Sequence, residues 1–201
     1  MSLANHIQVN TSYTRSINIE RDLDSAEGGR PYIPTARSIQ TIGRIADTLH
    51  EDSAPRAWAL IGPYGSGKSA FGLFLSNLLS SSDWEPASRA RVVLKQADAK
   101  LGRKINKSIG DSSGYCRITI TGSPEPLTRR LALAMLAAAV EFRGKQFGAK
   151  PGFMRSLEIA IKSSAEIAVG DLIDWLSDLQ QQVIKVDGKG VLIVIDELGK
   201  F

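Results

Sequence analysis

The chain has 201 residues, of which 43% are hydrophobic and 23% charged, and its formal net charge is +4; these values are ordinary for a soluble globular domain with one substantial core. A membrane protein or a disulfide scaffold is disfavoured, because the longest apolar run (residues 131–140) is too short to span a bilayer, residues 1–10 have no signal-peptide core, and Cys116 is the single cysteine. We therefore expect a cytoplasmic protein without a membrane segment.

The beginning of the chain predicts a polar arm followed by one helix. Residues 1–31 are polar and irregular. Pro34 and Thr35 then open a helical pattern, which residues 51–55 end. Its hydrophobic side chains share one face of the helix: Ile39, Ile42, Ile45, Ala46 and Leu49.

A glycine-rich motif follows between a predicted strand and a predicted helix. Residues 57–61 are a short apolar run suited to a buried strand, and residues 70–79 have hydrophobic side chains at helical spacing. Between them stand Gly62, Pro63, Tyr64, Gly65, Ser66, Gly67, Lys68 and Ser69, with Ala70 next. They fit G-x-x-x-x-G-K-[ST], the phosphate-binding P-loop, and the strand–loop–helix order is the one that this motif needs.

Each fixed position of the motif has a separate physical role. Glycine allows backbone conformations closed to other residues and lets amide groups approach phosphate oxygens. Lys68 would place its charge on the β- and γ-phosphates, and the Ser69 hydroxyl would bind Mg²⁺. A helix that begins here also directs the positive end of its dipole at the same anion.

A basic stretch follows between residues 89 and 107, where Asp98 is the single acid. Hydrophobic side chains recur there at spacings of three and four, so we predict one basic amphipathic helix. Its charges could simply form a solvated face of the helix, or they could form a surface that binds nucleic acid or an acidic partner. No aromatic residue lies among them, so stacking on bases is not indicated. The basic residues are Arg89, Arg91, Lys95, Lys100, Arg103, Lys104 and Lys107.

The second half of the chain predicts a strand, three helices and a final strand. Tyr115–Thr121 is rich in β-branched residues, as strands are. A helix should begin at Ser123 and Pro124 and run to about residue 142. After a loop at residues 144–152, further helices are predicted at residues 153–168 and 171–184. The last has one hydrophobic face: Leu172, Trp175, Leu176, Leu179 and Val183.

Two carboxylates end the final predicted strand, residues 191–197. Its five consecutive apolar residues suit a central parallel strand. Because ligands bind at the carboxyl ends of strands in an open α/β sheet, Asp196 and Glu197 should lie at the same edge as the glycine motif. Asp196 could then bind Mg²⁺ together with Ser69, and Glu197 could polarise the attacking water.

The two motifs, GPYGSGKS and VLIVIDE, resemble the Walker A and Walker B motifs of the additional-strand, catalytic-glutamate branch of P-loop NTPases. The acid after the Walker B aspartate points to this branch. The layout is most similar to AAA+ ATPases, especially their origin-initiator-like and STAND-type members, which often place Tyr-x-Pro and one helix before the Walker A strand. Tyr32 and Ile33, before Pro34, occupy that place, so the resemblance implies that they lie near the adenine.

This resemblance implies an α/β fold of the P-loop NTPase type, with three α/β/α layers around a mainly parallel sheet. Residues 1–31 would be the arm and residues 32–201 the N-terminal part of the ATPase domain, with Walker A at 62–69 and Walker B at 191–197. ATP and Mg²⁺ would be the cofactors, with Lys68 and Glu197 as the catalytic residues. A homo-oligomer is implied, since arginine fingers in this superfamily usually come from a neighbouring subunit.

The resemblance stops at residue 201, before any sensor, arginine finger or lid. The strand that normally lies between the two motif strands is also missing, so we expect a fragment whose sheet has a gap there or pairs these strands abnormally. Three functions remain open. The chain could be the nucleotide-binding half of an ATPase that drives remodelling or signalling, a nucleotide-gated module that recruits DNA or a protein, or a remnant that does not hydrolyse ATP.

Overall fold

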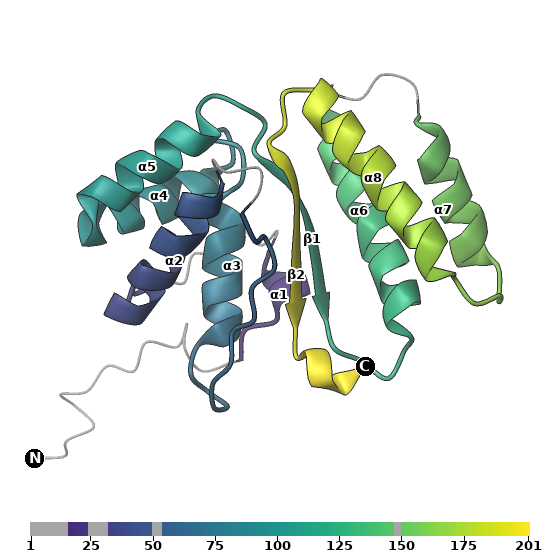
Figure 1. Ribbon diagram of the computed structural model, residues 1–201, viewed down its shortest axis with the longest axis horizontal. Helices are drawn as coiled ribbons and strands as arrows, with labels where there is room; N and C mark the ends of the chain where they lie inside the picture. Colours follow the sequence, from purple (N-terminus) through teal and green to yellow (C-terminus); the bar gives the residue numbers. More distant parts are fainter. Residues whose placement is uncertain (1–15, 24–31, 50–53, 147–149) are drawn as a thin grey trace, which may run out of the picture.

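Two parallel strands lie at the centre of the computed structural model, with helices on both sides (Figure 1). The structure describes residues 16–23, 32–49, 54–146 and 150–201. Strand β1 (Tyr115–Thr121) pairs with strand β2 (Gly190–Asp196) in parallel, in a register that runs from Tyr115 opposite Gly190 to Thr121 opposite Asp196. The strands predicted at residues 115–121 and 191–197 and the α/β class are therefore confirmed.

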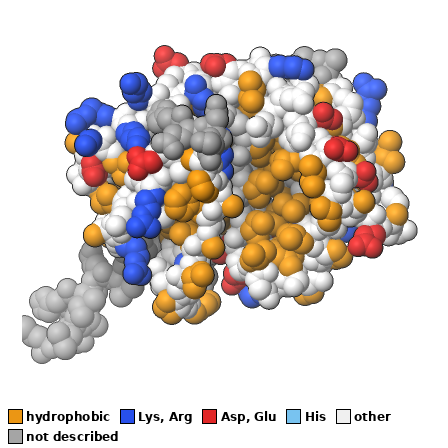
Figure 2. All heavy atoms as spheres, in the orientation of Figure 1, with side chains coloured by type: hydrophobic (Ala, Val, Ile, Leu, Met, Phe, Trp, Pro, Cys, Tyr) orange, Lys and Arg blue, Asp and Glu red, His pale blue; other side chains and the backbone are white. Residues whose placement is uncertain are grey.

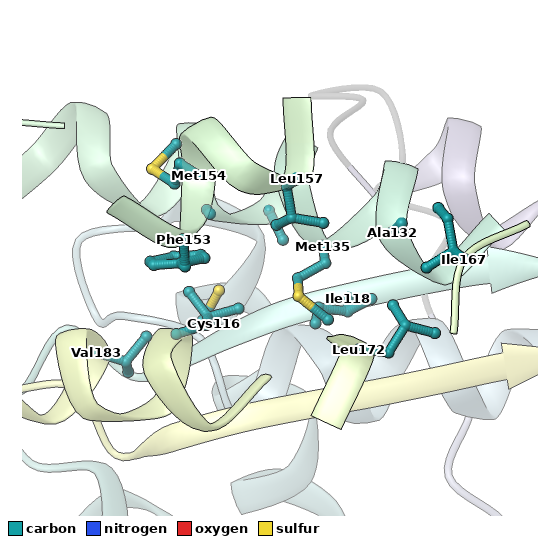
Figure 3. Packing of buried hydrophobic residues seen from close by; sticks show 13 residues of the cluster. Cys116, Ile118, Ala132, Met135, Phe153, Met154, Leu157, Ile167, Leu172 and Val183 are labelled. Carbon is teal, nitrogen blue, oxygen red and sulfur yellow. The ribbon is translucent and has the colours of Figure 1, made fainter. Parts of the chain in front are cut away.

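One face of the sheet packs against three helices, α6 (Leu127–Gln146), α7 (Gly152–Lys162) and α8 (Val169–Lys185). Cys116 and Ile118 of β1 point into this core, which Figure 3 shows from close by. The other buried members come mainly from the three helices: Ala132, Met135, Ala138, Ala139, Phe153, Met154, Leu157, Ile167, Leu172, Leu179 and Val183. The predicted inward face of α8 is confirmed, with Trp175 and Leu176 half-buried at its margin.

The opposite face meets a second core, because successive side chains of a strand point to opposite sides. Tyr115 and Leu192 pack there against helices α2 (Ala36–Thr48), α3 (Lys68–Leu78), α4 (Glu85–Ala97) and α5 (Ala99–Ile109). A short helix, α1 (Ile19–Asp22), adds Ile19 and Leu23 against Leu73 of α3 and Val194 of β2. Helix α1 lies in the segment predicted as an arm, most of which is outside the described residues.

The basic stretch forms two helices, so the prediction of a single helix over residues 89–107 is wrong. Asp98 has an extended backbone (φ −150°, ψ 101°) and ends α4. Its side chain accepts a hydrogen bond from the Leu101 amide and so caps the start of α5. An aspartate competes with the helix by such local bonds, which is why the chain breaks here.

The other helix boundaries differ less from the predictions. Helix α2 begins as predicted, because Thr35 and Ser38 form reciprocal capping bonds. Helix α6 begins four residues after Ser123, at Leu127, and continues through Gln146 into the predicted loop. Helix α7 ends at Lys162 rather than near residue 168. None of the helices in the described ranges is long and apolar enough to cross a membrane.

The predicted strand before the glycine motif does not form. Residues 57–61 have no regular structure, and the side chains of Trp58, Leu60 and Ile61 are exposed. Within the described part of the chain, the sheet contains only β1 and β2, so neither this segment nor the second edge of β2 has a strand partner. The two motif segments are thus unpaired with each other, as expected for a sheet with a gap between them.

Cys116 provides a test of the core that contains it. Burial raises the pKa of its thiol to about 12, and the nearby Glu141 carboxylate acts in the same direction. Because the thiolate is the reactive form, we expect iodoacetamide to leave the native protein unmodified at pH 8 and to modify it once denaturant unfolds the core. Mass spectrometry would measure the extent of alkylation, and the result refers to Cys116 alone because the chain has one cysteine.

The same burial predicts how stability depends on pH. Below about pH 7 the thiol is protonated in both the folded and the unfolded chain, so it does not change the free energy of unfolding there. Between about pH 9 and 12 only the unfolded chain loses the proton, so Cys116 lowers stability as the pH rises. Cys116→Ser would remove this component, and fast alkylation of the native protein would contradict the buried position.

Candidate functional site

Residues 62–67, which we call the glycine loop, adopt a backbone that requires glycine at two positions. Gly65 and Gly67 have φ angles of 76° and 84°, in the left-handed region that other residues rarely adopt. The Ser66 amide donates a hydrogen bond to the Pro63 carbonyl at 3.3 Å and closes the turn. The loop is exposed, so its outward amide groups are accessible to a ligand.

Helix α3 begins directly after the glycine loop, at Lys68. Gly67 precedes it without any side-chain cap, and the first helical bond runs from the Phe71 amide to the Gly67 carbonyl at 2.9 Å. The amides of the first turn therefore have no partner within the helix and point toward the loop. Together with the helix dipole, they make this end of α3 attractive to an anion.

The Lys68 side chain folds back over the glycine loop. Its Nζ donates to the carbonyl oxygens of Gly62 and Pro63 at 3.0 and 2.8 Å. An ammonium group is thereby held beside the uncapped amides, and both are complementary to phosphate.

The carboxylates predicted at the end of β2 lie where that strand ends. Glu197 has a left-handed backbone (φ 53°), and its amide donates to Oδ1 of Asp196 at 3.0 Å. Gly122, which follows β1, packs against this turn so closely that a Cβ atom there would lie 2.2 Å from the Glu197 carbonyl oxygen. The two strands therefore hold the Asp196–Glu197 turn firmly.

Lys200 is a site residue that the sequence analysis did not assign. Its Nζ lies 2.7 Å from Oε2 of Glu197, within a short 3-10 helix at Leu198–Lys200. The spacing of three residues could have suggested this ion pair. The pair is exposed, so its contribution to stability is small.

The two motifs lie at the same end of the molecule, and the surroundings of Lys200 agree with this. The hydrogen bond that Lys200 donates to Glu197 chiefly raises the pKa of Lys200, and the charges of Tyr64 and Asp196 add to this effect. Tyr64 belongs to the glycine loop and Asp196 to the end of β2, so both lie within electrostatic reach of the same ammonium group. Figure 1 shows the start of α3 and the end of β2 at the same end of the fold.

Tyr32 and Ile33, which the resemblance implies near the adenine, lie beside α3. The Tyr32 ring stacks on Phe74 with centroids 4.2 Å apart, and burial raises its pKa. Phe74 lies about 9 Å along the helix axis from Lys68. Ile33 is exposed.

Two surface hollows lie on the outer side of β1 rather than at the glycine loop. They are lined by residues of β1 and α6 that form ion pairs. Arg117 pairs with Glu141 at 2.9 Å, and Arg130 pairs with Glu20 at 2.7 Å. The first pair joins β1 to α6 and the second joins α6 to α1, so we interpret both hollows as structural.

The candidate magnesium ligands offer hard oxygen donors of the kind that Mg²⁺ prefers. Ser69 supplies a hydroxyl at the start of α3, and Asp196 supplies a carboxylate at the end of β2. Because Mg²⁺ keeps several waters and the phosphates of its nucleotide, two protein oxygens are sufficient. The described residues contain no cluster of three or more His, Cys, Asp or Glu side chains, so a site built from protein ligands alone is not indicated there.

Comparisons with protein-family models, curated proteins and solved structures gave no match. The functional argument therefore depends on the residues and the geometry described above.

Proposed function

We propose that this chain binds ATP with Mg²⁺ through the glycine loop and the first turn of α3, as a member of the P-loop NTPases. The observation that carries the proposal is the combination of two left-handed glycines, an uncapped helix start and a lysine folded over the loop. Each of these three features attracts or accommodates phosphate, and together they are the parts of a P-loop.

Each side chain of the site would have a separate role in phosphoryl transfer. Lys68 would bind the β- and γ-phosphates, and Ser69 and Asp196 would hold Mg²⁺, which neutralises charge on the phosphates. Glu197 would orient and polarise the attacking water. Lys200 donates its hydrogen bond to Oε2 of Glu197, so Oε1 of the same carboxylate is left to accept a hydrogen bond from the water.

The sheet supports the additional-strand branch of this family. Strands β1 and β2 are neighbours, whereas residues 57–61, just before the glycine loop, pair with no strand among the described residues. A three-layer P-loop fold would result if one further strand paired between residues 57–61 and β2. In this proposal ATP hydrolysis drives remodelling or signalling in the assembled protein.

Titration calorimetry would test nucleotide binding directly. We expect ATP with Mg²⁺ to bind with a dissociation constant between about 1 μM and 1 mM, the range in which enzymes usually bind substrates. Chelation of Mg²⁺ should weaken the binding, because the Ser69 and Asp196 oxygens act through the metal. If a protein that is folded by circular dichroism releases no heat with millimolar ATP and Mg²⁺, the proposal is wrong. GTP, titrated in parallel, would establish the preference for the base.

A further inference from the structure

Helix α5 presents an unbroken basic stripe to solvent. Lys100, Arg103 and Lys107 are exposed and stand three and four residues apart, so they lie on one face of the helix. Helix α5 contains no acidic residue. No described residue forms an ion pair with any of the three.

Helix α2 extends this stripe with residues from outside the stretch that the sequence analysis singled out. Arg37 and Arg44 are exposed and seven residues apart, again on one helix face. The next residue on that face, Asp47, forms an ion pair with Lys104 of α5. Lys104 is the helical neighbour of Lys100 and Lys107, so this ion pair joins the two stripes. Figure 2 shows basic side chains gathered over α2 and α5 in one view.

Helix α4 adds one further cation where it crosses α5. The backbone of Lys95 packs against Gly102 so closely that a Cβ atom at Gly102 would lie 2.8 Å from its Cα, while the Lys95 side chain is exposed. We call the exposed set the basic face; it consists of Arg37, Arg44, Lys95, Lys100, Arg103 and Lys107.

Two arginines of the predicted stretch do not belong to the basic face. Arg91 binds the carbonyl oxygens of Leu78 and Ser80, and its burial lowers its pKa. Arg89 forms an ion pair with Glu85. Both are therefore engaged within the fold.

The side chains around the basic face indicate which polyanion it fits. On α2 and α5, as far as they are described, no large hydrophobic side chain is exposed, and on α4 Val92 alone is. One valine is much less than the row of large apolar side chains with which a helix inserts into a lipid bilayer. The basic face also has no exposed aromatic ring on which single-stranded bases could stack. The basic face can therefore attract a partner only through its positive charge. Arginine and lysine are the residues that bind the phosphate backbone of nucleic acids.

We propose that the basic face binds the sugar–phosphate backbone of duplex nucleic acid, independently of base sequence. Residues 100–107 extend about 10 Å along α5. A DNA duplex carries roughly six phosphate charges over that length, so a helix laid along the backbone could contact several of them. The basic face lies on helices other than α3, so this binding does not depend on the proposed nucleotide site.

Fluorescence anisotropy with a labelled DNA duplex of about 20 base pairs would test this proposal, over salt concentrations from about 50 to 200 mM. Six contacts would give a slope of log affinity against log salt of about −5. In the triple variant Lys100→Gln, Arg103→Gln and Lys107→Gln, we expect the slope to become shallower by about 3 and the affinity to fall at least about tenfold.

A matched control removes the same charge elsewhere. The control is the triple variant Arg155→Gln, Lys185→Gln and Lys189→Gln. These three residues are also exposed but lie outside the basic face, so the control should keep most of the DNA affinity and of the salt slope. Equal losses in both triple variants would show that only net charge matters and would overturn the proposal. Tighter binding to polyglutamate or to vesicles of anionic lipid than to the duplex would overturn it as well. The Lys68→Met variant should bind DNA as the original protein does. DNA binding therefore tests the basic face whether or not the glycine loop binds ATP.

Discussion

Replacement of Lys68 with methionine is expected to weaken the binding of ATP and Mg²⁺ on the order of 100-fold. Methionine keeps much of the apolar length of the side chain and removes the ammonium group that now lies 2.8–3.0 Å from the loop carbonyls. A hydrogen bond to a charged group contributes about 1.5–3 kcal/mol, and 2.7 kcal/mol corresponds to about 100-fold in affinity. Calorimetry of the variant beside the original protein would measure the difference.

Lys162→Met is the matched control for this prediction. Lys162 is exposed in the last turn of α7, so its loss should leave the affinity for ATP unchanged. Thermal unfolding should give similar midpoints for both variants, because Lys68 is not buried in either core. An affinity that survives Lys68→Met would refute the proposed role of the glycine loop.

Replacement of Glu197 with glutamine should lower ATP turnover by roughly 10²–10⁴-fold, the usual contribution of a positioned general base. Glutamine has nearly the same shape and can still accept the hydrogen bond from Lys200, but it cannot take a proton from water. ATP affinity should remain within about threefold, since Glu197 acts on the water rather than on the nucleotide. Phosphate release under saturating ATP would measure turnover, and calorimetry would measure binding.

Glu166→Gln provides the comparison for this second experiment. Glu166 is exposed between α7 and α8, so its replacement should change neither turnover nor binding. Normal turnover in Glu197→Gln would assign the general base to another residue. Loss of ATP binding in the same variant would indicate instead that the Asp196–Glu197 turn supports the glycine loop.

The sequence predicted the parts of the fold that depend on local patterns. Strands β1 and β2 are short runs rich in apolar and β-branched residues, and α2 and α8 have hydrophobic residues at clear helical spacing. Residues 57–61 show the same strand-like pattern but find no partner within the described chain. A strand depends on hydrogen bonds to a neighbour that is distant in sequence, so propensity alone could not predict this outcome.

The break at Asp98 was missed for a different reason. The hydrophobic spacing of Leu94, Leu101 and Ile105 continues across the break, because both helices bury those side chains in one core. What separates α4 from α5 is the extended backbone of one capping residue. The close crossing at Gly102 is a tertiary contact that no local pattern contains.

At the candidate site, the sequence predicted the individual residues and the loop conformation better than the contacts between side chains. The left-handed glycines follow directly from the motif, since few other residues adopt that conformation. The three-residue spacing of Glu197 and Lys200 fits their ion pair, but the left-handed backbone of Glu197 is rare for that residue type and was not predicted. The role of α2 in the basic face required the tertiary packing of α2 on α5.

One edge of β2 has no partner strand in the part of the chain that the structure describes, and this has a practical consequence for work with the purified protein. It presents backbone amides and carbonyls beside exposed Ile193, and Figure 2 shows hydrophobic side chains gathered between β2 and α8. Such an edge is a template for strands of other molecules, and nature usually blunts it with charge, proline or a covering element. We therefore expect the chain to self-associate as its concentration rises. Light scattering should define the concentration range in which affinities describe single molecules.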